Sequence, residues 1–262
     1  MPHSEPPPEH DLGLAYDLTT LSRRRALRLF AGVGLAALVG CAPEEESSAA
    51  TDAASCEEIP EETAGPYPGD GSNGPNVLTE SGIVRSDIRS SFGSASGTAD
   101  GIPLTVTLEL LDQANGCASL ASAAVYLWHC DREGRYSLYS EGATDQNYLR
   151  GVQEADDDGT VTFTTIFPAA YSGRWPHIHF EVYPSLAEAT NAGTMLATSQ
   201  LAFPEDVCDL VYATDGYEQS IQNMAQTSLE SDMVFRDGVD QQLATMSGDA
   251  GSGFTATLAL AV

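Results

Sequence analysis

The chain has 262 residues, with 11 basic and 38 acidic side chains, and its formal net charge is −27 at pH 7. All of the basic residues are arginine, and so acidic a balance excludes a nucleic-acid binder that depends on a broad basic surface. Hydrophobic residues make up 42% of the chain and include ten Tyr, eight Phe and two Trp. This composition excludes a disordered chain and is enough for one sizeable core.

The first forty residues have the order of an export signal. An arginine-rich stretch at 23–28 precedes an apolar run at 29–39, which is too short to cross a bilayer, since that takes roughly 20 residues. The adjacent arginines resemble a twin-arginine signal, and residues 38–41 (Leu-Val-Gly-Cys) resemble a bacterial lipobox. We predict that residues 1–40 are removed and that Cys41 carries a lipid anchor at the bacterial cell envelope. The alternative is an ordinary buried helix.

The next segment, residues 41–59, is acidic and rich in small residues. Such a composition is typical of a flexible tether. The remainder, residues 60–262, has the length of one domain.

Four cysteines follow Cys41, at Cys56, Cys117, Cys130 and Cys208. An even number in an exported protein predicts two disulfides. A strand is expected between Cys117 and Cys130 and would separate them by roughly 25 Å, well beyond the roughly 7 Å that a disulfide spans. Excluding that pair leaves two of the three pairings open.

The domain has the pattern of an all-β protein. Short stretches with alternating or continuous apolar residues are separated by turns rich in Gly and Asp. Strands are expected at 104–110, 123–130, 159–166, 176–183 and 254–262, and only 186–192 and 217–230 suggest helix. We therefore predict a β-sandwich with little helix.

A pair of histidines lies on one expected strand. His177 and His179 are two residues apart, so their side chains point to the same face, about 6.6 Å apart along the strand. Two imidazoles on one face can bind one metal ion, and on this evidence zinc, copper and iron all remain open. The alternative is an ordinary pair on a half-exposed strand.

Three motifs around this pair occur in a specific order. They are Trp-His-x-Asp-x-x-Gly-x-Tyr-Ser from Trp128, Asp-Gly-x-x-x-Phe-x-Thr-Ile-x-Pro-x-x-Tyr ending at Tyr171, and Arg-x-Pro-His-Ile-His-Phe from Arg174. Together they resemble the intradiol ring-cleavage dioxygenases, the protocatechuate and catechol dioxygenase family. The segment Glu-Thr-Ala-Gly-Pro-Tyr that ends at Tyr67 resembles the part of that family ahead of its core. The resemblance runs from about residue 60 to 205.

The resemblance implies one mononuclear non-haem Fe(III) site with Tyr136, Tyr171, His177 and His179 as ligands. Two phenolates and two neutral imidazoles would leave the centre at net +1, so a catechol dianion could chelate it. By the same analogy, Tyr171 leaves the metal and takes a catechol proton, and Arg174 stabilises negative charge on the substrate. Both atoms of O₂ would then enter between the two hydroxyl-bearing carbons.

The resemblance also suggests that Tyr67 lines the substrate pocket, although simple packing is the alternative. The expected partners are a small aromatic diol and O₂, with no nucleic acid and with membrane contact only through the lipid anchor. The oligomeric state stays open. The competing function is a non-catalytic surface lipoprotein that binds a ligand or partner through a vestigial metal site. The loop before Tyr171 departs from the family, because Ala169-Ala170 stands where Pro-Gly-x-Tyr is common.

Overall fold

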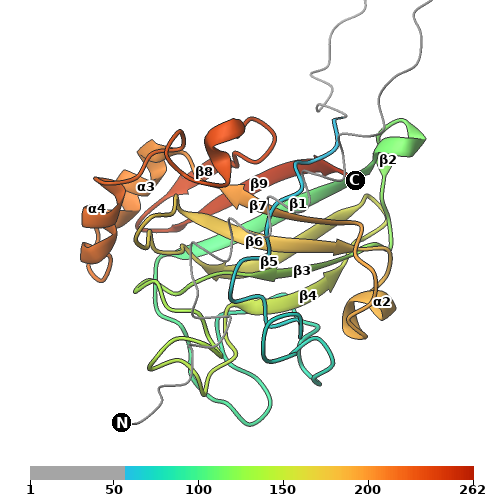
Figure 1. Ribbon diagram of the computed structural model, residues 1–262, viewed down its shortest axis with the longest axis horizontal. Coiled ribbons are helices and arrows are strands. Elements are labelled where there is room, and N and C mark those ends of the chain that lie inside the picture. The colour runs from blue at the N-terminus through green and yellow to red at the C-terminus, as the bar shows by residue number, and fades with distance from the viewer. Residues whose placement is uncertain (1–56) are drawn as a thin grey trace, which may run out of the picture.

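The computed structural model describes residues 57–262, which form two β-sheets with loops and short helices around them (Figure 1). The first sheet has the order β2-β1-β9-β8, and β5 also pairs with β1. Its strands are β1 (Pro103–Asp112), β2 (Ala118–Ser119), β5 (Thr160–Ile166), β8 (Thr245–Asp249) and β9 (Gly253–Ala261).

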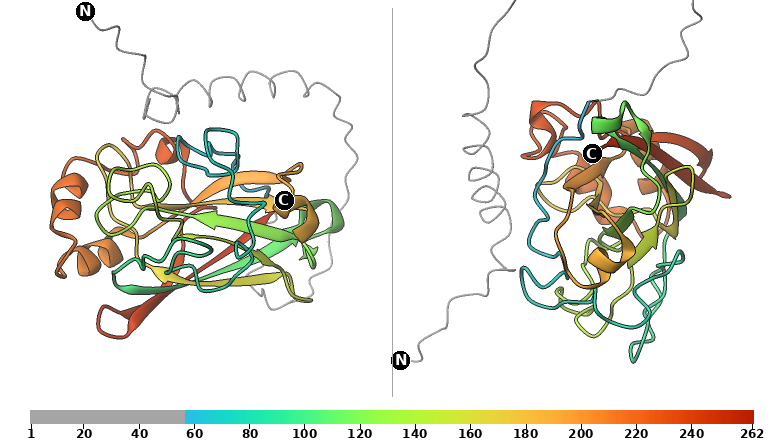
Figure 2. Two further views of the ribbon diagram at one scale, coloured as in Figure 1. Left: turned by 90° about the horizontal axis from the view of Figure 1, so that it is seen from below. Right: turned by 90° about the vertical axis from the view of Figure 1, so that its right-hand side faces the viewer.

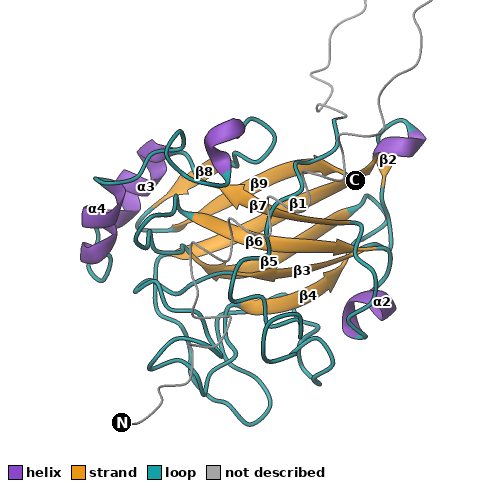
Figure 3. Ribbon diagram, in the orientation of Figure 1, coloured by secondary structure: helices purple, strands orange, loops and turns teal. Residues whose placement is uncertain are grey.

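The second sheet is antiparallel and has the order β4-β3-β6-β7. Its strands are β3 (Ala124–Trp128), β4 (Arg150–Glu154), β6 (His177–Tyr183) and β7 (Ala197–Ala202). Within residues 57–262, helices are few and lie at the periphery (Figure 3). They are α2 (Leu186–Thr190), α3 (Glu205–Tyr212), α4 (Glu218–Met224) and the short 3₁₀ helices η2 (Gln113–Asn115) and η3 (Phe235–Asp237). No described helix has the length and apolar character needed to span a bilayer.

The inter-sheet core follows from the alternation in the sequence. On β1, Leu104, Val106, Leu108 and Leu110 are buried against the second sheet, while the residues between them face outward. β9 pairs with β1 in parallel and alternates in the same way. The two strands therefore present one continuous apolar face, as expected for a half-buried strand.

The strand β6 is buried on both faces. Ile178, Phe180 and Val182 belong to the inter-sheet core, so His177 and His179 point to the opposite face of the sheet. That outer face is covered by a second apolar cluster, called here the outer cluster. Loops as well as strands contribute to it, and its buried members are Val77, Leu78, Ile83, Ala124, Tyr126, Trp128, Cys130, Tyr136, Tyr139, Val152, Ala169, Tyr183 and Ala189.

The helices α3 and α4 lie side by side at one end of the sandwich, and α2 lies at the other (Figure 2). The sequence predicted α2 and the position of α4, which is shorter than expected, but it did not predict α3. All five expected strands are present, with bounds that differ by a few residues. The strands β2, β4, β7 and β8 were not predicted.

The expectation of two disulfides is wrong. Cys130 and Cys208 are free and buried, and both of the open pairings required each of them to be bonded. Cys130 packs in the outer cluster and Cys208 in the inter-sheet core, where each acts as a small hydrophobic side chain. Cys117 is not a free thiol, and Cys56 lies outside the described residues. The signal at 1–40, with Cys41 and most of the tether, also lies outside them.

Candidate metal centre

Three different segments bring the predicted ligands to one place on the outer face of the second sheet. His177 and His179 are the first and third residues of β6. Tyr136 lies on the loop between β3 and β4, and Tyr171 lies on the loop between β5 and β6. Because β3 pairs with β6, both loops leave their strands close to the two histidines.

The four side chains converge on the Nε2 atom of His177. This atom lies 3.2 Å from Nε2 of His179, 3.2 Å from the Tyr171 hydroxyl oxygen and 3.5 Å from the Tyr136 hydroxyl oxygen. Donor atoms that bind one metal at about 2.1 Å lie about 3 Å from one another. The distances from Nε2 of His177 to the other three donors therefore suit a single metal ion.

The backbone orients the imidazole of His177. Its Nδ1 lies 2.5 Å from the carbonyl oxygen of Trp175, and because a carbonyl only accepts, Nδ1 must carry the proton. The neutral ring then directs the Nε2 lone pair at the other donors, as a metal ligand requires. Trp128 stacks on His179 with ring centroids 5.0 Å apart and nearly parallel planes, which limits the rotation of that ring.

Burial determines the protonation states of these residues in the metal-free protein. It lowers the pKa of His177 and of His179 well below the ordinary value, so both imidazoles are neutral and can bind a cation. Burial also raises the pKa of Tyr136 well above its ordinary value, with the neighbouring Tyr171 adding to the effect. A cation bound among these residues would reverse that shift and stabilise the phenolates.

The donors at this place are phenols and imidazoles rather than carboxylates or thiolates, and such a set suits iron. Within the described residues, no group of three or more His, Cys, Asp or Glu side chains could hold a metal ion. The histidine pair is therefore completed by phenols, and phenolate oxygen is a hard donor that suits Fe(III). The residues present fit the metal that the family resemblance implies.

The guanidinium of Arg174 is fixed by two side chains that the sequence did not single out. Its Nε donates to Asp232 at 2.9 Å, and its Nη2 donates to Gln200 at 2.6 Å. Gln200 lies on β7, directly opposite His179 on β6. The positive charge of Arg174 also contributes to the low pKa of both histidines, so it acts on the donor cluster.

Neither partner of Arg174 had a usable signal in the sequence. Gln200 lies on a strand without apolar alternation, and Asp232 lies in a stretch with no motif. Asp232 is fully buried and also accepts from the backbone N–H of Trp175 and of Val234. The carboxylate of Asp232 therefore joins the segment around Val234 to the turn that carries Arg174.

The ring of Tyr67 lies against the ring of Tyr136, with centroids 4.8 Å apart. The fully buried Arg150 holds the Tyr67 segment in place, because its Nη2 donates to the carbonyl oxygen of Tyr67 and to that of Ser137. Arg150 thus ties two segments beside the candidate centre to β4, and sequence reasoning missed it. Tyr67 is close enough to the donor cluster to form one wall beside it.

The comparisons with known proteins identify the family to which the chain belongs. A family model described as "Dioxygenase" matches residues 74–239, which is more than half of the chain. The chain therefore belongs to this dioxygenase family, and its resemblance to intradiol ring-cleavage dioxygenases is confirmed.

Among solved structures, the chain is similar to an intradiol ring-cleavage dioxygenase from Tetranychus urticae. The TM-score is 0.58 and the identity 28%, over 70% of this chain and 87% of that chain. The dioxygenase domain of a dioxygenase carbohydrate-binding protein fusion from Streptomyces sp. SirexAA-E has a TM-score of 0.50 and 23% identity, over 79% of this chain and 98% of that chain, and shows the same fold.

Among curated proteins, a chlorocatechol 1,2-dioxygenase from Rhodococcus opacus is 35% identical over 52 residues. That match covers 20% of this chain and 20% of the relative, so the chain matches about a fifth of the relative's length.

Proposed function

We propose that the protein is a mononuclear non-haem Fe(III) dioxygenase that opens the ring of a catechol-type substrate between its two hydroxyl-bearing carbons. The observation that carries this proposal is the convergence of two phenols and a second neutral imidazole on Nε2 of His177, each at 3.2 to 3.5 Å from that atom. The four residues also stand in the order of the intradiol motifs along the chain.

Each protein group has a distinct task in this proposal. A bound ferric ion would supply the Lewis acidity that holds a catechol as its dianion and prepares the ring for dioxygen. Tyr136, His177 and His179 are buried and would hold the ion. Tyr171 is only half-buried, and its phenolate would accept a proton from the incoming diol. Arg174 stabilises the negative charge that builds up on the substrate.

The substrate class follows from the same groups. Two adjacent hydroxyls are needed to chelate one ion, and one of them would deliver its proton to Tyr171. The Tyr67 ring lies beside Tyr136 and offers an aromatic wall for a flat ring. O₂ contributes both of its atoms, so a catechol becomes a ring-opened diacid with no other co-reactant.

The location is a separate proposal that rests on the sequence of residues 1–41 alone. We infer that the protein is exported with its domain folded and is tethered by lipid at Cys41. Twin-arginine export carries folded proteins, which suits a domain that has acquired its metal before crossing the membrane.

The experiment that tests the function is oxygen uptake by the iron-loaded protein with a panel of simple and substituted catechols. Consumption of one O₂ per diol, with a ring-opened diacid as product, is expected. If the iron-loaded protein takes up no oxygen with any catechol of the panel, the result would favour the non-catalytic binding module instead.

A further inference from the structure

The four residues before Tyr171, called here segment 167–170, have a dense set of side-chain hydrogen bonds. All four residues are buried, and each of their carbonyl oxygens accepts from a different side chain. The Tyr217 hydroxyl donates to Phe167 at 2.8 Å, and the Tyr212 hydroxyl donates to Pro168 at 3.1 Å. The Cys130 thiol donates to Ala169 at 3.6 Å, and the Asn223 side-chain amide donates to Ala170 at 2.8 Å.

Most of these bonds come from the α3–α4 region. Tyr212 is the last residue of α3, Tyr217 directly precedes α4, and Asn223 lies within α4. The helix α4 contacts Ala170 twice, because the buried Ser220 also accepts from its N–H at 3.1 Å. Both backbone polar groups of the residue next to Tyr171 are thus bonded to a single helix.

The chain is much more open on the other side of Tyr171. Ser172 and Gly173 are exposed and form a turn in which the N–H of Arg174 donates to the Tyr171 carbonyl at 3.3 Å. Tyr171 therefore stands where a tightly held segment meets an exposed turn. The position of its main chain is set mainly from the side of segment 167–170.

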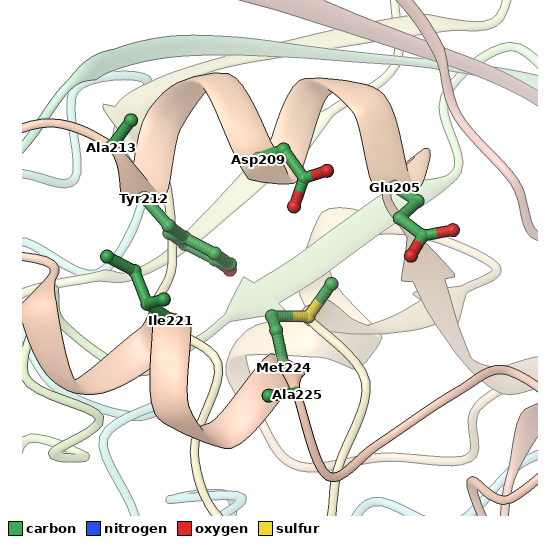
Figure 4. A pocket seen from close by; sticks show the side chains of 7 residues that line it. All are labelled: Glu205, Asp209, Tyr212, Ala213, Ile221, Met224 and Ala225. Carbon is green, nitrogen blue, oxygen red and sulfur yellow. The ribbon is translucent and has the colours of Figure 1, made fainter.

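The two helices hold this segment from separate positions. Between them lies a cavity of about 390 Å³, lined by Tyr212 of α3 and by Ile221 and Met224 of α4, with two acidic residues of α3 on its rim (Figure 4). The Tyr212 ring lines this cavity, while its hydroxyl reaches Pro168. The α3 bond is made to Pro168 and the α4 bond to Ala170, so we expect the loss of one to leave the other in place.

We propose that α3 and α4 act together as a clamp on segment 167–170 that positions Tyr171 at the metal centre, with Tyr212 and Asn223 as positioning residues. For its metal-dependent part, this inference rests on the proposed function. A displacement of about 1 Å is enough to cost a catalytic site roughly 100-fold in rate. The clamp would thereby govern how well the Tyr171 phenolate meets the metal and how readily it is displaced.

The test uses Tyr212→Phe, Asn223→Ala and the double variant. The matched control is Gln222→Ala, which truncates an exposed side chain of the same helix. In the metal-free protein, hydrogen–deuterium exchange of the peptide covering residues 167–171 should rise roughly tenfold in the double variant, since two neutral hydrogen bonds are lost. In the control it should not change.

The second readout is the visible phenolate-to-iron band of the loaded protein. In the double variant the band should shift toward that of Tyr171→Phe, while Gln222→Ala keeps the wild-type band. Unchanged exchange would overturn the clamp, and so would faster exchange with an unshifted band. A wild-type protein that takes up no iron would refute the proposed function instead, and the exchange measurement would still decide whether the helices hold segment 167–170.

Discussion

The four donor side chains of the candidate centre are enclosed to different degrees. Tyr136, His177 and His179 are at most 2% exposed, whereas Tyr171 is only half-buried. A ligand that leaves the metal during the reaction needs space into which its ring can move. The difference in burial therefore supports the proposal that Tyr171 is the displaceable ligand, as the family resemblance also implies.

Arg174 should be needed for turnover but not for binding of the metal. Replacing it by Ala should keep the visible colour and lower kcat by roughly 10²- to 10³-fold, because a preorganised charge stabiliser is lost. The exposed Arg89→Ala is the matched control and should keep wild-type turnover.

The Arg174→Ala protein should also lose about 3–5 kcal/mol of stability, because Asp232 is left buried without its cation. Adding Asp232→Asn should restore part of that stability without restoring turnover. Full turnover in the stabilised double variant would show that Arg174 has only a structural role.

The buried histidines make the stability of the metal-free protein depend on pH. Burial lowers the pKa of His129 to about 4, and it lowers those of His177 and His179 well below their ordinary value. In the unfolded chain these groups titrate near 6.5. Below that pH the unfolded state binds more protons, so stability falls as the pH decreases, by about 1.4 kcal/mol per pH unit for each histidine.

Urea unfolding of the metal-free protein between pH 7.5 and 5 measures this dependence. For His129 the loss extends from about pH 6.5 down to about pH 4. The variant His129→Gln should have a shallower slope, because one of the three titrating groups is gone. A stability that does not change between pH 7.5 and 5 would contradict the neutral, buried state of these residues.

At the level of elements, the sequence predicted strands whose side chains alternate and missed those without a pattern. β1 and β9 alternate over most of their length, and the His-x-His pair marked β6. By contrast, β7 has the sequence Ala-Thr-Ser-Gln-Leu-Ala and is buried on both faces, so no period-two signal exists. Local pattern cannot show that a strand of small and polar residues lies inside a sheet.

The same limit applies to the candidate site. Its four donors could be predicted because their motifs are local in the chain. The residues that hold the site together could not be predicted, because Arg150, Gln200, Asp232 and Asn223 reach it only through long-range packing. The two free cysteines were misjudged for the same reason, since their apolar surroundings come from distant segments.

The turn that leads into β5 provides a stability prediction at this scale. Gly159 has a φ of +75°, and an added Cβ would lie 2.6 Å from the carbonyl oxygen of Leu110. Gly93 has a φ of +66° with open space around it, so Gly93→Ala should cost only the left-handed strain of about 1–2 kcal/mol. Gly159→Ala should lower the free energy of unfolding clearly more than Gly93→Ala does, and urea unfolding measures both. Equal losses would contradict the close approach of this turn to the edge of β1.

At the scale of the whole molecule, the sandwich places the centre on the outer face of one sheet, beneath loops and away from the inter-sheet core. The α3–α4 pair at one end of the sandwich contacts the loop that carries Tyr171 (Figure 1). The proposed export and lipid anchoring rest on the sequence of the first 41 residues, and under that proposal the protein would work outside the cytoplasm.

Export should depend on the paired arginines and anchoring on Cys41. Changing Arg23 and Arg24 together to Lys should block export, because a twin-arginine route requires both. Cys41→Ala should abolish labelling with palmitate while leaving the folded domain intact. Fractionation of cells and labelled palmitate measure the two steps, and normal export of the double lysine variant would exclude the twin-arginine route.

The central claim is tested most directly by the visible absorption spectrum of the purified protein after metal loading in the presence of both iron and zinc. Two phenolates on Fe(III) should make the protein red-brown and stable in air, and catechol should shift the band to longer wavelength. Tyr136→Phe and His179→Ala should each weaken iron retention, because each removes a donor of the cluster. A colourless protein that binds zinc stoichiometrically would contradict the assignment and, with it, the dioxygenase function.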